Sequence, residues 1–161
     1  ALRVIGERPD IQQRLRDEPE LIPIFIEETL RLESPVKSGF RVARKTTTVG
    51  ETAVPAGTTL MFCPGAANRD PDHFPDPNTF DLERTNVREH LTFGRGIHSC
   101  PGSPLARIEG RVTVERFLAR MADIRVSEQH HGHNGHRHYD FEPTYILRGL
   151  TTLHLDFTPK A

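Results

Sequence analysis

The chain has 161 residues, 35% of them hydrophobic, which is enough to bury the core of one domain. Its 21 basic and 22 acidic residues nearly cancel, to a formal net charge of −1, and so give no sign of the basic surface that nucleic-acid-binding proteins carry. No apolar stretch is long enough to span a bilayer and no signal peptide begins the chain, so we expect no membrane anchor.

The N-terminal part of the chain predicts three helices. Residues 1–7 have the pattern of the end of a helix, and a chain that begins at Ala1 inside such a pattern looks cut rather than natural. Pro9 suits the first turn of a short helix over residues 9–17. Apolar residues recur at helical spacing from Glu20 to Glu33, and Ser34-Pro35 is expected to end this helix.

After this helix the pattern changes to strands. Residues 40–47 and 58–63 are predicted strands that flank a turn-rich connection. Cys63 ends the second apolar run and is predicted to be a core residue of that strand. Two cysteines make no disulfide framework, and reduced thiols suit a cytoplasmic protein. A short helix is expected near residues 66–68, and residues 70–90 are a long ordered-loop candidate, which is uncommon unless functional.

The clearest predicted helix runs from Pro104 to about Met121. A strand is expected at residues 124–126, followed by a polar, histidine-rich stretch and then by a hairpin of residues 145–147 and 153–157. The period of the helix is carried by Leu105, Ile108, Val112, Glu115 and Leu118. With no internal repeat and no linker, the pattern predicts one domain over residues 1–161, mainly α with small β-sheets, an α+β fold.

Cys100 lies near the end of the glycine-rich run Phe93-Gly94-Arg95-Gly96-Ile97-His98-Ser99-Cys100-Pro101-Gly102, just before this helix. Glycines let the backbone turn tightly and approach a flat ligand closely. A thiol just ahead of a helix lies at the positive end of its dipole, which favours the thiolate, the form that binds metals. A lone cysteine is more often a buried small hydrophobe, but the glycines around this one favour a metal ligand.

The spacing Phe-x-x-Gly-x-x-x-Cys-x-Gly, met here at Phe93, Gly96, Cys100 and Gly102, resembles the haem-ligand signature of the cytochrome P-450 family. His98, two residues before the cysteine, is also usual in that family. The resemblance covers nearly the whole chain and matches the C-terminal, haem-binding part of a soluble bacterial member. It implies that haem b, iron protoporphyrin IX, is bound through Cys100 as the axial thiolate.

The same resemblance assigns further residues to the haem. Phe93 is expected to pack near the thiolate and shield it from water, and the glycines to bring N–H groups toward the sulfur. Arg41 and His98 are expected to bind the haem propionates, because arginine donates two parallel hydrogen bonds to a carboxylate. The alternatives are a strand-surface charge for Arg41 and a loop histidine bonded to backbone for His98. The expected haem contacts are Phe93, Gly94, Gly96, His98, Gly102 and Arg41.

Glu28 and Arg31 lie three residues apart on one face of a predicted helix. Alone, such a pair is usually a surface ion pair of little energy. It resembles the Glu-x-x-Arg motif of the same family. In that family the glutamate and the arginine of the motif bond to a further arginine in the long loop before the cysteine. Arg84 is the matching third residue here, and the role implied for the cluster is to hold this loop against the helix.

Two segments resemble stretches that line the substrate pocket in the family. Their candidate residues for contact with a small organic substrate are Val36, Lys37, Phe40, Tyr145 and Ile146. Members of the family receive electrons on the proximal side from a ferredoxin or a flavoprotein, so the resemblance implies such a partner at the basic residues around the cysteine loop, with an ordinary solvated helix face as the alternative. This cluster comprises Arg88, Arg95, Arg107 and Arg111. The histidine tract 130–138 is expected to be a solvated loop, with at most adventitious nickel or zinc affinity.

The activity implied by the resemblance is that of a haem-thiolate monooxygenase, which inserts one oxygen atom from O2 into an organic substrate. In the family a long central helix carries an acid–alcohol pair that delivers protons to bound oxygen, and neither that helix nor that pair is in this chain. Two alternatives therefore remain open. One is a truncated haem-binding module without oxygenase activity, and the other is a peroxygenase that uses hydrogen peroxide. The isolated chain is expected to be inactive.

Overall fold

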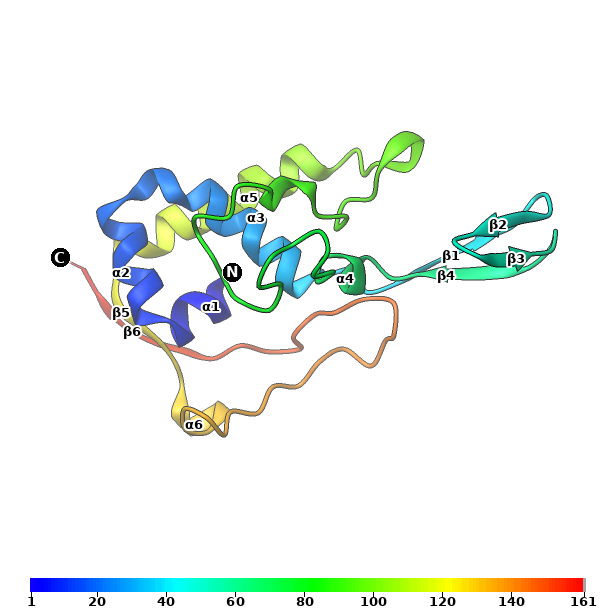
Figure 1. The fold of residues 1–161 in the computed structure, drawn as a ribbon. Helices are drawn as coiled ribbons and strands as arrows, with labels where there is room; N and C mark the ends of the chain where they lie inside the picture. The colour runs from blue at the N-terminus through cyan, green and yellow to red at the C-terminus, as the bar shows by residue number, and fades with distance from the viewer. Residues whose placement is uncertain (161) are drawn as a thin grey trace.

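The molecule is a body of helices from which a narrow β-ribbon projects, as seen in a computed structural model that describes residues 1–160 (Figure 1). The ribbon holds strands β1 (Gly39–Val42) and β4 (Thr59–Phe62), with the hairpin β2 (Thr47–Val49) and β3 (Thr52–Val54) at its tip. All three sheets are two-stranded and antiparallel. This agrees with the α+β class expected from the sequence.

The three predicted N-terminal helices are present. They are α1 (Leu2–Glu7), α2 (Pro9–Asp17) and α3 (Ile22–Glu33), and a short 3-10 turn, η1 (Pro19–Leu21), precedes the last of them. Prolines occupy the first turns of α2 and α3, where a missing N–H costs no helical hydrogen bond. Ser34, with φ +35°, ends α3 in the left-handed region, and the proline that follows cannot continue the helix.

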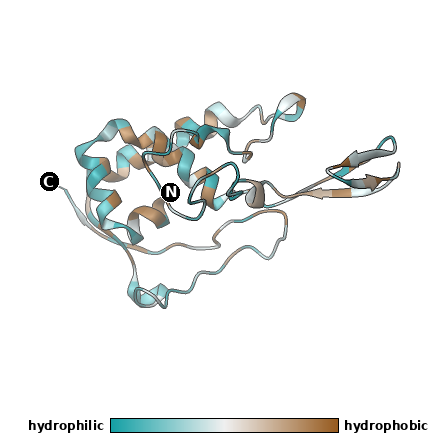
Figure 2. Cartoon of the chain, viewed as in Figure 1, coloured by the Kyte–Doolittle hydropathy of each residue, from teal (hydrophilic) through white to brown (hydrophobic). Residues whose placement is uncertain are grey.

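The hydrophobic core lies between α1, α2, α3, the helix α5 (Ser103–Arg120) and the strand β5 (Met121–Val126). Helix α3 packs closely against α5 at Gly110, where an added Cβ would lie 3.2 Å from Cδ1 of Ile26. Figure 2 shows apolar residues in the helical body and again along the ribbon. The buried core residues are Val4, Ile5, Ile11, Leu15, Ile22, Phe25, Ile26, Leu82, Val114, Leu118 and Ile124.

The ribbon differs from the two strands predicted for it. The first predicted strand, residues 40–47, ends at Val42, because the chain there leaves its pairing with β4 and forms the separate β2–β3 hairpin, which turns at Gly50 with φ +57°. Cys63 is half-buried and lies just after β4, ahead of the short helix α4 (Pro64–Ala67). The prediction that Cys63 is a core residue of the strand is therefore wrong.

Helix α5 has the predicted bounds to within one residue, but its buried face differs from the predicted one. Val114 and Leu118 are buried, whereas Leu105, Ile108 and Val112 are exposed by 59%, 53% and 39%. The apolar contacts of α5 with the other helices lie at Gly110, which faces Ile26, and in the C-terminal half of the helix, where Val114 and Leu118 join the core. Among residues 1–160 no helix is long and apolar enough to cross a membrane.

The predicted C-terminal hairpin is wrong. Strand β6 (Leu155–Pro159) pairs with β5, while Leu147 forms a bridge with Val36 and Phe141 with Leu150. Alternation in the sequence indicates extended chain but does not say which segment pairs with it. The partner of residues 145–147 is the chain directly after α3, where Lys37 N–H donates to the carbonyl of Ile146 at 2.8 Å.

Candidate functional site

The Cys100 loop is a closed turn between the 3-10 turn η2 (Val87–Glu89) and α5, with a second 3-10 turn, η3 (Gly96–His98), inside it. The N–H of Cys100 donates to the carbonyl of Phe93 at 2.8 Å and closes the loop. Gly94 and Gly96 have φ of +69° and +71°, which favours glycine at both. At Gly94 an added Cβ would also lie 3.2 Å from the carbonyl oxygen of His98. The backbone of the loop therefore requires these two glycines.

The thiol of Cys100 is free and exposed at the start of α5. An added Cβ at Gly102 would lie 3.7 Å from the sulfur, so the glycine keeps one side of it open. Ile97, in the same loop, is 96% exposed. An accessible sulfur and an uncovered apolar side chain in one loop fit a large, flat, partly apolar group such as haem. That the glycines bring N–H groups toward the sulfur stays a prediction.

The two expected propionate ligands are exposed and lie on different elements. Arg41, in β1, donates to the neighbouring carbonyl of Phe40 at 2.8 Å, and its guanidinium lies 4.7 Å from the centre of the Phe62 ring. No carboxylate within residues 1–160 pairs with Arg41, which leaves most of its donors for another acceptor. His98 is exposed in η3 on the Cys100 loop. The structure does not bring these two side chains into contact with each other.

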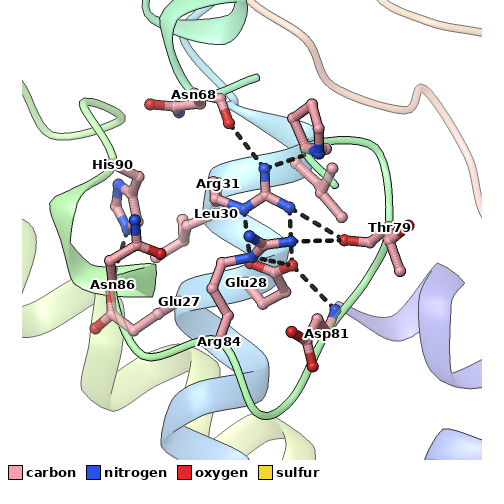
Figure 3. A network of polar contacts seen from close by, with 12 residues as sticks. Glu27, Glu28, Leu30, Arg31, Asn68, Thr79, Asp81, Arg84, Asn86 and His90 are labelled. Atoms are coloured by element: carbon pink, nitrogen blue, oxygen red, sulfur yellow. Dashed lines mark hydrogen bonds and ion pairs between the residues drawn. The ribbon is translucent and has the colours of Figure 1, made fainter. Parts of the chain in front are cut away.

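The predicted contacts of Glu28, Arg31 and Arg84 are present (Figure 3). Glu28 and Arg31 are completely buried on α3, and Arg31 donates from Nε and Nη2 to the two carboxylate oxygens at 2.7 and 2.8 Å. Arg84 donates from Nε to Oε1 of Glu28 at 3.2 Å. Backbone N–H of Asp81 adds a fourth hydrogen bond to this carboxylate, at 3.0 Å. The Glu28 carboxylate on α3 thus accepts hydrogen bonds from two arginines and from a backbone N–H.

The remaining donors of the two arginines fix the long loop of residues 70–90. Arg31 bonds to the carbonyls of Asn68 and Pro77 at 2.8 and 2.7 Å, and Arg84 to that of Pro75 at 2.7 Å. Both also donate to Thr79, as Figure 3 shows. A guanidinium presents its donors in a rigid plane, so these bonds define where the loop lies on α3.

A second buried carboxylate, Glu27, binds two other groups beside the Cys100 loop. Arg107 of α5 donates to its two oxygens at 2.6 and 3.1 Å, and His90 lies 3.0 Å from Oε2 through Nε2. Thr92 N–H donates to Nδ1 of His90, so Nε2 carries the hydrogen that His90 gives to Glu27. Sequence reasoning missed Glu27 and His90, and two adjacent acids in an apolar helical run were the only available sign.

The pKa of Glu27 reflects this environment. Burial alone would raise it, but the hydrogen bonds from His90 and Arg107, together with the positive charge of Arg107, lower it from the ordinary 4.5 to about 2. A group with a lowered folded-state pKa stabilises the fold above its unfolded-state pKa. The contribution of Glu27 is therefore complete above pH 4.5 and is lost as the pH falls through about 2.

Glu27→Gln should flatten the pH dependence of stability in acid. We expect the free energy of unfolding of the unaltered protein to fall more steeply between pH 4.5 and 2 than that of the variant, because the amide introduced by the substitution binds no proton there. Urea unfolding followed by circular dichroism over this range measures the difference. Glu115→Gln, in an exposed pair with Arg111, is the control and should keep the slope. Equal slopes for Glu27→Gln and the unaltered protein would contradict the assignment.

The five candidate substrate contacts lie in two segments that the fold brings together. Val36 and Lys37 follow α3 and pair through their backbone with residues 146–147, and the ammonium of Lys37 donates to the carbonyl of Thr144 at 2.9 Å. Phe40 and Tyr145 pack edge to face, with ring centres 6.5 Å apart. Ile146 is 38% exposed. These side chains form an apolar, partly exposed surface at the base of the ribbon.

Three of the four basic residues around the Cys100 loop gather at one place. Arg88, Arg107 and Arg111 line a cavity of about 280 Å³ between α3, η2 and α5, together with the apolar Ile26 and Ile108. Arg95 is exposed on the loop itself and does not line this cavity.

The histidine tract is partly structured. Helix α6 (Glu128–His131) begins it, and His131 is buried, bonded through Nδ1 to the carbonyl of His138 and through Nε2 to the N–H of His154. The expectation of a wholly solvated loop is wrong at His131, because the chain before β6 covers it. In the part of the chain that the structure describes, no three His, Cys, Asp or Glu side chains are arranged to hold a metal ion.

Comparison with known proteins gives the family. The family model for Cytochrome P-450 matches residues 1–127. The solved cytochrome P-450 CYP150A6 of Mycobacterium marinum, in its substrate-free form, is similar with 62% identity and a TM-score of 0.98 over 99% of this chain and 39% of that chain. Cytochrome P-450 144 of Mycobacterium tuberculosis is 43% identical over 128 residues, 80% of this chain and 30% of its own length.

A further relative is the Beta-dihydromenaquinone-9 omega-hydroxylase of Mycobacterium bovis, 39% identical over 160 residues. These cover 97% of this chain and 30% of that protein, so the chain spans about a third of the length of the relatives it matches. These matches indicate the same family as the cysteine loop and the buried Glu28–Arg31–Arg84 cluster do. The chain belongs to the cytochrome P-450 family, whose members are haem-thiolate monooxygenases.

Proposed function

We propose that residues 1–161 form one haem-binding portion of a haem-thiolate monooxygenase, with Cys100 as the axial ligand of haem b. The observation that carries this is the closed loop that presents one free, exposed thiol at the start of α5. When bound, haem supplies the activation of dioxygen, and the chain supplies the thiolate, the orientation of the group and the exclusion of water.

Each residue of the site has a separate part in this proposal. Cys100 gives the sulfur ligand, and Phe93 covers the loop beside it. Arg41 and His98 bind the propionates, because both are exposed and Arg41 has no carboxylate partner among residues 1–160. The Glu28 cluster does no chemistry, but it keeps the long loop, which leads into the Cys100 loop, in place on α3.

The substrate that fits best is a small organic molecule with an apolar part. The surface of Phe40, Tyr145 and Ile146 is apolar and partly exposed, and the Lys37 ammonium already has a backbone partner. Burial of such side chains against a substrate contributes roughly 25 cal/mol for each Å² of apolar surface removed from water.

An electron-donor ferredoxin or flavoprotein is the proposed partner on the proximal face. The cavity of about 280 Å³ is lined by Arg88, Arg107 and Arg111 and by apolar Ile26 and Ile108; Arg107 is paired with Glu27 and Arg111 with Glu115, so Arg88 contributes most of its net positive charge. Positive charge attracts an acidic partner from a distance, while an apolar centre holds it once docked. We place the protein in the cytoplasm, where both cysteines would stay reduced.

Activity measurements distinguish two other functions from the proposed monooxygenase. A truncated haem-binding module would bind haem but turn over no substrate, and residues 1–161 alone should behave in this way if the acid–alcohol pair is needed for proton delivery. A peroxygenase would form product from peroxide and substrate without any reductase.

The proposal is tested by loading the complete polypeptide that carries this chain with haem, reducing it and adding carbon monoxide. The Soret band should move to the long-wavelength position typical of a thiolate ligand. A Soret band of the imidazole type would contradict it. Product formed with oxygen, an electron donor and reductase supports the monooxygenase, product formed with peroxide alone supports the peroxygenase, and no product in either reaction supports the module.

A further inference from the structure

The guanidinium of Arg107 is fixed in a defined plane by Glu27. It donates from Nε and Nη2 to the two oxygens of that carboxylate, at 2.6 and 3.1 Å. The Glu27 side chain is only 4% exposed, whereas that of Arg107 is 37% exposed. A paired, charge-assisted bond to a buried carboxylate is strong and directional, so the exposed end of Arg107 is held by its buried partner.

The plane fixed in this way lies against Phe93. The central carbon of the Arg107 guanidinium is 4.7 Å from the centre of the Phe93 ring, a cation–π contact. The ring of His90 is 6.0 Å from the same ring, and His90 is bonded to Glu27 as well. Two groups that contact Phe93 are therefore both anchored on one buried carboxylate.

Phe93 is in turn joined to the ligand residue. Its carbonyl accepts the N–H of Cys100 at 2.8 Å, so a displacement of Phe93 changes the backbone that carries the sulfur. The position of Phe93 and that of the backbone carrying the sulfur are therefore coupled.

We propose that Glu27 is a positioning residue for Cys100: by holding Arg107 and His90 against Phe93, it sets the reduction potential of haem bound at Cys100. This inference rests on the proposed function. In Glu27→Gln the neutral amide binds Arg107 more weakly, and the exposed guanidinium turns into solvent. Phe93 then loses both groups that hold it in place, and in the haem-bound protein more water reaches the iron–thiolate unit. Reduction adds negative charge at the iron–thiolate unit, and water stabilises that charge, so the potential should become more positive.

The experiment measures the midpoint potential of the haem by spectroelectrochemical titration of the complete polypeptide that carries this chain. Glu27→Gln and Arg107→Lys should both shift the potential in the positive direction, since lysine keeps the charge but loses the planar contact with Phe93. In a Phe93→Leu background, Glu27→Gln should produce no further shift. Glu115→Gln, which removes an exposed carboxylate from the same helix as Arg107, should leave the potential unchanged.

Three results would overturn the inference. No shift in either Glu27→Gln or Arg107→Lys would show that the cluster does not act on the haem. The same shift for Glu27→Gln with and without Phe93 would show a charge acting through space rather than through the ring. A shift in the Glu115→Gln control would show a general effect of surface charge. If Glu27→Gln does not fold, Arg107→Lys with and without Phe93→Leu makes the same comparison. Failure of the proposed function is seen separately, as an unaltered protein whose reduced carbon-monoxide complex lacks the thiolate-type Soret band.

Discussion

Cys100→Ser should abolish the thiolate-type Soret band of the reduced carbon-monoxide complex while leaving the fold intact. Serine has nearly the shape of cysteine, the side chain is exposed, and the N–H bond to Phe93 is made by the backbone. A serine hydroxyl does not ionise near neutral pH, so it cannot replace a thiolate as the anionic ligand. Difference spectra of the reduced protein with and without carbon monoxide, beside far-ultraviolet circular dichroism, separate the loss of the ligand from loss of structure.

Cys63→Ser is the matched control for this variant. Cys63 is the second cysteine in the chain, half-buried next to α4 at the base of the ribbon. The same chemical change there should leave the thiolate-type band in place. A band that survives in Cys100→Ser, or one that disappears only in Cys63→Ser, would show that Cys100 is not the ligand.

Arg31→Ala should destabilise the protein by about 3–5 kcal/mol, the range seen when one member of a buried ion pair is removed. Glu28 would stay buried with Arg84 as its one cationic partner, at 3.2 Å, and the N–H of Asp81 as its other donor. The carbonyls of Asn68 and Pro77 would lose their donors in the same change. Urea unfolding monitored by circular dichroism measures the loss. Since globular domains are stable by only about 5–15 kcal/mol, this loss removes a large share of the total stability.

Arg69→Ala removes the same type of side chain from a neighbouring position and serves as the comparison. Arg69 is exposed and donates to Asn78 and to the carbonyl of Leu32. Its loss should cost less than about 1 kcal/mol, as for other exposed polar contacts. If Arg31→Ala and Arg69→Ala unfold at the same urea concentration, the buried cluster does not hold the fold as we describe.

The helices were the most predictable part of this structure. The apolar period of α3 and α5 and the prolines at the starts of α2 and α3 set their bounds, because these are local signals. The same periodicity did not predict which face of α5 is buried. Leu105 and Ile108 follow the period but are exposed, since burial depends on what packs against the helix and not on the helix alone.

The residues of the candidate site also differ in how well the sequence predicted them. Glu28, Arg31 and Cys100 were recognisable because their motifs have fixed spacing, and Arg84 because the resemblance supplied its place. Glu27 has no motif, and its partners His90 and Arg107 lie 63 and 80 residues away. The pairing of residues 145–147 with the chain after α3 was also missed, because a strand pattern in the sequence does not identify the segment with which the strand pairs.

The attachment of the long loop has a consequence for how this region opens. The side chains of Glu28, Arg31 and Arg84 meet beside one turn of α3. They form hydrogen bonds with the N–H of Asp81 and with the carbonyls of Thr79 and Pro75. Such a loop cannot loosen residue by residue, because releasing Arg84 or Arg31 frees most of its anchors at once. Residues 70–90 therefore open as one cooperative unit, held by the Glu28 cluster, by the burial of Phe74, Leu82 and Val87, and by the bond of His90 to Glu27.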